Sequence, residues 1–255
     1  MTHKNDHIKK IVLNGLMTGL VFLATSVIKI PTVNGYIHLG DGFIFISAII
    51  LGPFYGSFAA GVGSMLADLL SPYAQWAVPS LIIKSLMALI MGLVIRQKTK
   101  KQAIISAVTT VAIWSLFFIV IKDVLAKAID FSIDNLSVDL EQTPENVMNA
   151  ASDIQTKLTV AIIGIIIIVF AILIYLVKKQ KTKTVGPGIV IGMLSSGACM
   201  VIGYYFAELI LYGNPISPIF SVPLNIIQLI VGIAITISIA PALIKANRYY
   251  NGKAD

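Results

Sequence analysis

The sequence predicts an all-α polytopic membrane protein, a helical bundle with about eight membrane segments. The first observation is composition: 57% of the 255 residues are hydrophobic and only 12% are charged, more apolar surface than a soluble core of this length can bury. The second is that apolar runs recur at the length of a spanning helix. The third is that basic residues gather between these runs and at the chain ends.

The apolar runs define the expected segments. Seven have the length of spanning helices and one is shorter, and they lie at about 11–29, 43–51, 54–70, 79–95, 103–121, 157–177, 187–212 and 223–244. Gly52-Pro53 alone separates the second from the third. Because such a pair ends one helix and opens the next, we expect a short helix and its return, a helical hairpin.

The basic residues set the expected orientation. Fourteen of the 19 lie in four groups: Lys4, Lys9 and Lys10; Arg96, Lys98, Lys100 and Lys101; Lys178, Lys179, Lys181 and Lys183; Lys245, Arg248 and Lys253. Alternating the segments from a cytoplasmic N-terminus puts all four groups on the cytoplasmic side, as the positive-inside rule requires. Both termini are therefore expected in the cytoplasm, and the net charge of +7 indicates topology rather than nucleic-acid binding.

The same alternation sends the stretch 122–156 outside, where acidic residues outnumber Lys122 and Lys127. Within it, Thr143-Pro144-Glu145 has the order of an N-cap, a first-turn proline and a first-turn acid. We therefore expect a helix to begin there and continue into the 157–177 span.

Several classes of protein are disfavoured by what the sequence lacks. It has no phosphate-binding Gly-x-x-x-x-Gly-Lys-Ser/Thr loop, no His-Glu-x-x-His and no Gly-x-Ser-x-Gly. Three histidines and one cysteine, Cys199, offer no plausible metal cluster. We expect no enzyme, no catalytic residues, no metal and no cofactor. The run after Lys9 and Lys10 could be taken for a secretory signal, but no small-x-small cleavage site follows it and more spans do.

Polar side chains share one layer near the expected outer end of the bundle. At a rise of about 1.5 Å per residue, Asp68, Lys84, Glu208, Asn225 and Gln228 lie within roughly 10 Å of the outer ends of four helices. Ionisable groups at membrane depth usually line a cavity that water reaches. The first loop, 31–42, adds Tyr36, His38 and Asp41, and aromatic rings at the same depth include Trp76, Tyr204, Tyr205 and Tyr212. These features suit a small planar polar ligand.

Structural explanations for the same residues stay open. Asp68 and Lys84 can pair as a buried strut, and Asn225 and Gln228 can bond neighbouring helices. The rings can form an interfacial aromatic belt. His38 can be solvated or a capping residue, and Asp41 can cap the second helix.

Gly15 and Gly19 form a Gly-x-x-x-Gly pair on the first helix. Small residues in this spacing let another helix approach closely. The approaching helix can belong to a partner or to this same bundle.

Six short strings together resemble the substrate-binding S components of energy-coupling factor (ECF) vitamin transporters, most closely the riboflavin and hydroxymethylpyrimidine type. They are residues 36–41, Gly52-Pro53, residues 67–70, Trp76, Ile83-Lys84 and residues 223–228. The resemblance covers about 9–100 and 185–246.

The resemblance implies a subunit in a bacterial cell membrane that binds a vitamin from outside. Its partners would be one transmembrane coupling subunit and two ATPase subunits. Gly15 and Gly19 match the positions of the family's Ala-x-x-x-Ala docking stripe. The ligand would be held by the first loop and the outer helix ends, with His38, Lys84, Asn225 and Gln228 as preferred contacts.

The chain departs from the family's usual six helices between about 103 and 177. We therefore expect three parts: core helices 1–4 in residues 1–102, an inserted helical hairpin with an acidic outer loop in 103–184, and the last two core helices with a cytoplasmic tail in 185–255. The hairpin's outer loop could reach over the pocket or be a peripheral addition.

The expected substrate is hydroxymethylpyrimidine or a vitamin B6 form, and riboflavin is the second choice. A rival from another class is a self-sufficient proton-coupled secondary transporter that uses Asp68, Lys84 and Glu208. A third hypothesis is a membrane scaffold with no small-molecule ligand.

Overall fold

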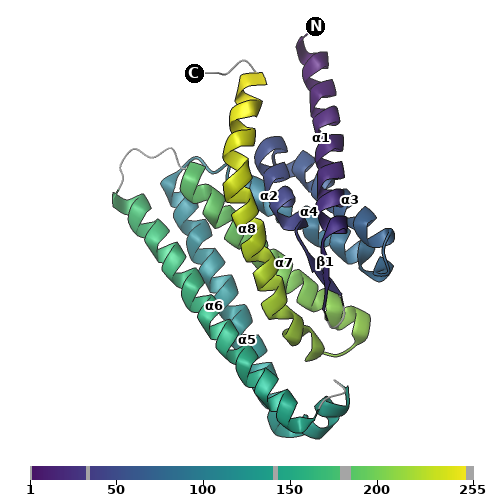
Figure 1. Ribbon diagram of the computed structural model, residues 1–255. Helices are drawn as coiled ribbons and strands as arrows, with labels where there is room; N and C mark the ends of the chain where they lie inside the picture. The colour runs from purple at the N-terminus through teal and green to yellow at the C-terminus, as the bar shows by residue number, and fades with distance from the viewer. Residues whose placement is uncertain (1, 33–34, 140–142, 179–184, 251–255) are drawn as a thin grey trace.

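A computed structural model describes residues 2–32, 35–139, 143–178 and 185–250. These residues form eight α-helices, one short 3₁₀ helix and two short strands (Figure 1). In chain order the elements are α1 (Thr2–Val27), β1 (Lys29–Pro31), β2 (Tyr36–His38), α2 (Gly40–Leu51), α3 (Pro53–Leu69), η1 (Ala74–Trp76), α4 (Ala77–Val94), α5 (Lys100–Asp139), α6 (Pro144–Lys178), α7 (Val185–Tyr212) and α8 (Ser217–Tyr250).

The prediction of an all-α polytopic bundle is confirmed. Six helices of the described chain, α1, α4, α5, α6, α7 and α8, are long and apolar enough to cross a membrane. α2 is a shorter apolar helix, and α3 has 17 residues. Large apolar side chains face outward along the spans, for example Val160, Ile167 and Phe170 on α6, each more than 60% exposed. Such a surface suits lipid rather than water.

Figure 1 shows the start of α1 and the end of α8 at one end of the bundle, with the β1–β2 hairpin directed toward the other. This arrangement fits the alternating path expected from the basic groups. The side of the membrane on which the ends lie stays a prediction. Residues 179–183 and Lys253, which belong to the predicted basic groups, lie outside the described residues.

The short helical hairpin expected at Gly52-Pro53 is present as α2 and α3. Gly52 has φ 83°, a left-handed conformation that favours glycine, and Pro53 occupies the first turn of α3. The two helices pack against each other, and both also contact α1 and α4. α3 thereby returns the chain to the end of the bundle at which α2 began.

The first loop contains a structure that sequence reasoning did not predict. Residues 29–31 and 36–38 pair as a two-stranded antiparallel sheet, with Lys29 opposite His38 and Pro31 opposite Tyr36. This β-hairpin contacts α1 and α8. It holds Tyr36 and His38 in fixed positions at the edge of the bundle.

α5 and α6 form a long antiparallel hairpin that contacts α7 and α8. α6 begins at Pro144 as expected, and the Thr143 hydroxyl accepts a hydrogen bond from the Asn146 amide at 3.3 Å. The helices have 40 and 35 residues, about 60 and 52 Å at a rise of about 1.5 Å per residue. Because the hydrocarbon layer is about 30 Å thick, both helices are long enough to extend beyond it at the end where the acidic residues lie.

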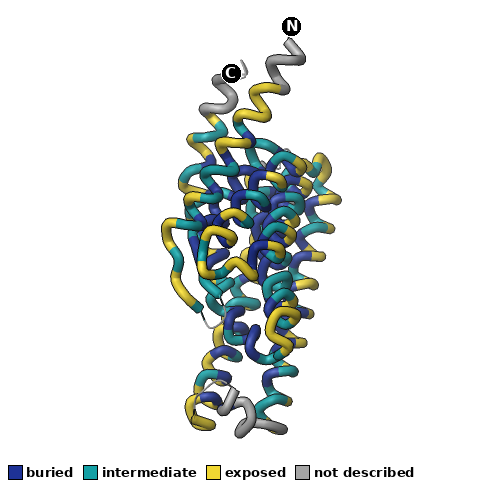
Figure 2. The backbone as a smooth tube through the Cα atoms, turned by 90° about the vertical axis from the view of Figure 1, so that its right-hand side faces the viewer, coloured by how far each residue is buried: buried dark blue, intermediate teal, exposed yellow. Residues whose placement is uncertain are grey.

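The buried residues lie along the middle of the bundle, between the helices (Figure 2). α2 and α8 approach closely there, because a Cβ on Gly232 would lie 2.9 Å from the Cβ of Asp41. A Cβ on Gly42 would lie 2.5 Å from the side chain of Ile235. These two glycines therefore let α8 lie directly on α2, which brings Gln228 within reach of Asp41.

Candidate binding site

A pocket lies where the β-hairpin meets the ends of four helices, α3, α4, α7 and α8. It contains about 490 Å³, its open mouth included. Its lining consists of Thr32, Gly35, Tyr36, His38, Asp68, Trp76, Ser80, Tyr204, Glu208, Ser221, Asn225 and Gln228. Residues nearly 200 positions apart thus share one cavity.

Three aromatic rings contribute to the pocket wall. The rings of Trp76 and Tyr204 lie 5.8 Å apart, and the Tyr204 hydroxyl lies 2.9 Å from the Ser80 hydroxyl. Tyr36 stacks in a tilted arrangement on Tyr73, with ring centroids 4.8 Å apart. Centroid distances in this range are typical of stabilising aromatic contacts. The wall offers flat apolar surface with hydroxyl groups at its edges.

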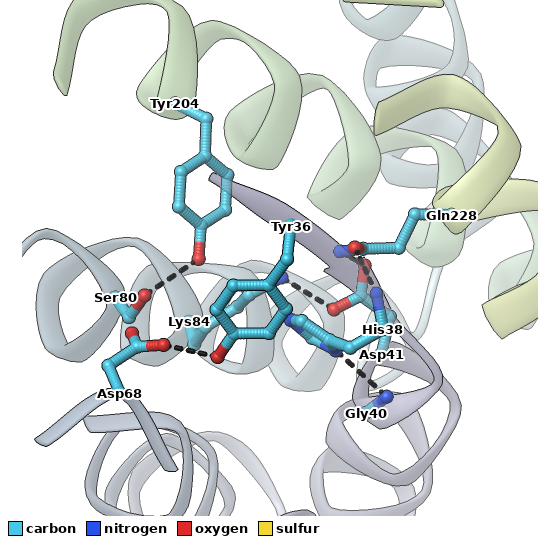
Figure 3. Close-up of polar contacts among 9 residues, drawn as sticks. All are labelled: Tyr36, His38, Gly40, Asp41, Asp68, Ser80, Lys84, Tyr204 and Gln228. Carbon is cyan, nitrogen blue, oxygen red and sulfur yellow. Dashed lines mark hydrogen bonds and ion pairs between the residues drawn. The ribbon is translucent and has the colours of Figure 1, made fainter. Parts of the chain in front are cut away.

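Among the described residues, Asp68 has a hydrogen-bond partner on one of its two carboxylate oxygens and none on the other. The Tyr36 hydroxyl donates a short hydrogen bond to its Oδ1 (Figure 3). Its Oδ2 is buried and has no hydrogen-bond partner in the part of the chain that the structure describes. The Ser80 hydroxyl, beside Asp68, shares a hydrogen bond with the Tyr204 hydroxyl in which either oxygen can be the donor. Since buried polar atoms are nearly always paired, we interpret this oxygen in the pocket lining as a candidate acceptor for a ligand.

Asp41, by contrast, is fully paired below the pocket. The Lys84 ammonium donates to its Oδ1 at 2.5 Å, and the Gln228 amide donates to its Oδ2 at 2.9 Å (Figure 3). Both charged side chains are completely buried. The amide oxygen of Gln228 accepts from the His38 backbone N–H at 2.9 Å. The chain of bonds ties the β-hairpin to α8, α2 and α4.

Charges around the β-hairpin are modulated by burial. Burial, with the Lys84 charge second, lowers the pKa of His38 to about 3, so its imidazole is neutral. Its Nδ1 accepts a hydrogen bond from the Gly40 N–H at 3.0 Å, which leaves the proton on Nε2. Burial also lowers the pKa of Lys29, against the opposing effect of Asp68. Lys29 donates to the Ala67 carbonyl at 3.2 Å.

Glu208 and Asn225 complete the polar part of the pocket. Glu208 is 3% exposed, and its Oε1 lies 3.4 Å from the hydroxyls of both Ser217 and Ser221. Asn225 lies one turn before Gln228 on α8, so both side chains face the cavity. Across the described residues, His, Cys, Asp and Glu side chains form no group of three that could hold a metal ion.

The structure brings most of the predicted site residues together. Seven line the pocket: Tyr36, His38, Asp68, Trp76, Glu208, Asn225 and Gln228. Asp41 and Lys84 lie behind the lining as an ion pair. Tyr205 faces the α5–α6 hairpin instead, with its ring 5.7 Å from that of Phe117 on α5. Its hydroxyl donates a hydrogen bond to the Pro215 carbonyl.

Two structural alternatives considered from the sequence are wrong in detail. The buried partner of Lys84 is Asp41, not Asp68, because the first turn of α2 faces α4. Asp41 does not cap α2, since the position before the helix is Leu39 and carries no side-chain cap.

The predicted site residues did not include five lining residues, Thr32, Gly35, Ser80, Tyr204 and Ser221, although the sequence placed Tyr204 at this depth. Ser80 lies four residues before Lys84 and so shares its helix face, a signal that could have found it. Tyr204 and Tyr205 could not be separated without the rotation of α7.

Gly15 and Gly19 lie on an open face of α1. A Cβ added to either would meet no atom within 4 Å in the described structure. Packing within this bundle therefore does not explain the pair. The neighbouring Val12 and Leu16 are more than half exposed.

The fold and the pocket together define a polytopic helical membrane protein with a polar, aromatic-lined pocket. Residues 5–179 match the family model of the ECF-type riboflavin transporter, S component. Because the match covers more than half of the sequence, the chain belongs to this family, a transporter component rather than a class of enzyme. The matched range includes all of α5 and α6, which we expected to be an insertion, and that interpretation stays a prediction.

The chain is also similar to a curated protein of Pyrococcus woesei described as "Uncharacterized protein in gap 3'region". The two are 45% identical over 65 residues, which cover 26% of this chain and 43% of that protein. The chain thus aligns with less than half the length of this relative. No solved structure matches the chain significantly.

Proposed function

We propose that the protein is the membrane-embedded capture subunit of an ECF transporter, which binds a small heteroaromatic vitamin from outside for ATP-driven uptake. Its membership of the S component family supports this proposal. The single observation that carries it is the pocket, which combines aromatic rings with convergent hydrogen-bonding groups at one end of the bundle. Trp76 and Tyr204 offer flat surface for a ring, and Asn225 and Asp68 offer polar atoms at its edge.

The substrate we propose is hydroxymethylpyrimidine or a vitamin B6 form, with riboflavin as the alternative that the family description favours. All three are flat rings with polar edges. They differ in size, and the test below includes each of them.

The β-hairpin is suited to act as the lid of the pocket. Three contacts fasten it: Tyr36 to Asp68, the His38 backbone to Gln228, and Lys29 to the Ala67 carbonyl. A ligand that touches Asp68 would stabilise the fastened state. Such a difference between loaded and empty forms is what coupling to a partner requires.

The open face at Gly15 and Gly19 is our proposed docking surface for the transmembrane coupling subunit, which would act with two ATPase subunits. Its small residues allow close helix approach, and no part of the described bundle covers it. Replacing both glycines with Leu should leave ligand binding unchanged and stop uptake. Normal uptake by this variant would remove the docking assignment.

The first test is native mass spectrometry of the detergent-purified protein, followed by calorimetric titration with the three candidate vitamins. Asn225→Ala should abolish or strongly weaken binding, whereas Asn146→Ala, an exposed asparagine on α6, serves as the matched control. Asn225 is preferred to Gln228 here, because Gln228 also supports the buried Asp41. Unchanged affinity in Asn225→Ala would contradict the site assignment.

The second test separates ATP-driven uptake from proton coupling. Membrane vesicles that hold the protein with its coupling module should stop uptake when ATP is depleted. Uptake that ignores ATP but collapses with an uncoupler would instead support the secondary transporter. Absence of any small-molecule ligand would support the scaffold.

A further inference from the structure

The pocket carries an uneven set of charges. Two carboxylates, Asp68 and Glu208, belong to its lining, and among the described lining residues no lysine or arginine accompanies them. Among the described lining residues only His38 could become cationic, and burial keeps it neutral by lowering its pKa to about 3. The described lining therefore presents two carboxyl groups and neutral donors, without a lysine or arginine that could receive an anionic group.

The two lysines nearest the pocket are already engaged. The Lys84 ammonium lies behind the lining, 2.5 Å from the Asp41 carboxylate and 5.0 Å from the Tyr204 ring centroid. Lys29 lies at the mouth, where its ammonium donates to the Ala67 carbonyl and sits 4.7 Å from the centre of the Tyr36 ring. Moving Lys84 toward a ligand would leave Asp41 as a buried unpaired charge, which is strongly unfavourable.

Asp68 adds a preference for hydrogen-bond donors to this charge pattern. Asp68 is 2% exposed, and its Oδ2 lacks a partner among the described residues. A ligand N–H or O–H can donate to this oxygen, whereas a ligand oxygen that bears negative charge would be repelled by it. Phosphate recognition relies on Arg, Lys or backbone N–H groups around the anion.

We propose that the pocket selects the neutral or cationic, donor-bearing form of its vitamin and rejects the phosphate ester of the same vitamin. Asp68 is the specificity-determining residue, and Glu208 reinforces it. This inference rests on the proposed function and names the substrate class of the same site. Because like charges in a buried interface cost several kcal/mol, the ester should bind on the order of 100-fold more weakly than its parent.

The test compares matched pairs on the detergent-purified full chain: riboflavin with its 5′-phosphate, pyridoxine with pyridoxine phosphate, and hydroxymethylpyrimidine with its phosphate ester. Calorimetry should show one parent compound binding and its ester about 100-fold weaker. Equal affinities for parent and ester would overturn the inference and leave the proposed function standing. If no compound binds, the proposed function fails, and the inference fails with it.

Charge-neutral variants test the assignment to Asp68. Asp68→Asn should reduce the ratio of the affinity for the parent vitamin to the affinity for its phosphate ester by about tenfold. This is the change expected for the loss of one charge contact worth about 1.4 kcal/mol. Adding Glu208→Gln should reduce this ratio further. Asp153→Asn on α6 makes the same change in net charge at an exposed ion pair and should leave the ratio unaltered. A ratio that stays the same in Asp68→Asn would overturn the role of this residue.

Lys29 provides the remaining check. If the ester's phosphate sat at the mouth against this lysine, Lys29→Gln would selectively weaken ester binding, and that result would overturn the proposal. An unchanged ratio of the two affinities supports it. The ratio of parent affinity to ester affinity is measured on the wild-type protein, without any substitution. The proposal can therefore be refuted even where a variant does not fold.

Discussion

Asp41 and Asp68 are both buried carboxylates in the same polar layer, but their surroundings differ. Asp41 has an ion pair on one oxygen and an amide donor on the other. Asp68 has the Tyr36 hydroxyl on one oxygen and no partner among the described residues on the other. The first carboxylate is enclosed behind the lining, and the second lies in it.

We interpret this difference as that between a carboxylate with a structural role and one available for ligand recognition. A buried charge is tolerated when its hydrogen-bonding capacity is filled from within the protein, and such a group holds elements together. A buried acceptor that the protein leaves unfilled has capacity for a ligand. Three substitutions, in order of decreasing expected effect, test this distinction.

Lys84→Met should produce the largest effect. It leaves Asp41 buried without its cation, and breaking a buried pair from one side costs about 3–5 kcal/mol of unfolding free energy. Thermal or denaturant unfolding in detergent measures the loss. The fall in stability should be accompanied by weaker vitamin binding, because the Gln228 contact to the β-hairpin depends on Asp41.

The double variant Asp41→Leu with Lys84→Met is the control. Removing both charges together leaves no unpaired buried charge, so its stability should lie well above that of Lys84→Met. If the double variant were as unstable as Lys84→Met, the ion pair would stabilise the fold beyond compensating its own two buried charges.

Tyr36→Phe should have an intermediate effect that appears in binding as well as in stability. It removes the hydroxyl that ties the β-hairpin to Asp68. A hydrogen bond to a charged group is worth about 1.5–3 kcal/mol, so ligand affinity should fall at least tenfold, mainly through faster dissociation. Stopped-flow measurement gives the dissociation rate and calorimetry gives the affinity, each with the vitamin that binds in the first test.

Tyr55→Phe on α3, which is not a lining residue, is the matched control and should bind as the wild type does. If Tyr36→Phe also kept wild-type affinity and dissociation rate, the β-hairpin would not be the lid.

Tyr205→Phe should have the smallest effect. It removes the hydrogen bond to the Pro215 carbonyl, which contributes about 1 kcal/mol to stability, and should not change ligand affinity. Tyr204→Phe, one residue away, should weaken binding because this ring lines the pocket and pairs with Ser80. A greater binding defect in Tyr205→Phe than in Tyr204→Phe would reverse our assignment of the two faces of α7.

Much of the fold was predictable from local sequence. Apolar runs of spanning length predicted the helices, Gly52-Pro53 predicted the turn between α2 and α3, and Thr143 to Glu145 predicted the start of α6. These signals succeed because each depends on residues close together in the chain. The β-hairpin escaped prediction, since its strands have three residues each and too few alternations to show a period of two.

The candidate site was predictable as a layer but not as a set of contacts. Depth follows from counting residues along each helix, so seven of the ten predicted residues do line the pocket. Rotation about the helix axis does not follow from counting. It decided that Tyr204 rather than Tyr205 faces the cavity, because adjacent helical residues point about 100° apart.

The sequence by itself determined that this chain is a helical membrane protein, where its segments turn, and which polar groups share a depth, because chain-local hydrophobicity and charge control these properties. Only the tertiary structure decided that Lys84 pairs with Asp41 and that the Oδ2 of Asp68 has no hydrogen-bond partner among the described residues. The physical reason is packing: Gly42 and Gly232 allow α8 to lie on α2, which supplies Gln228 to Asp41 and leaves Asp68 in the cavity without an equivalent partner.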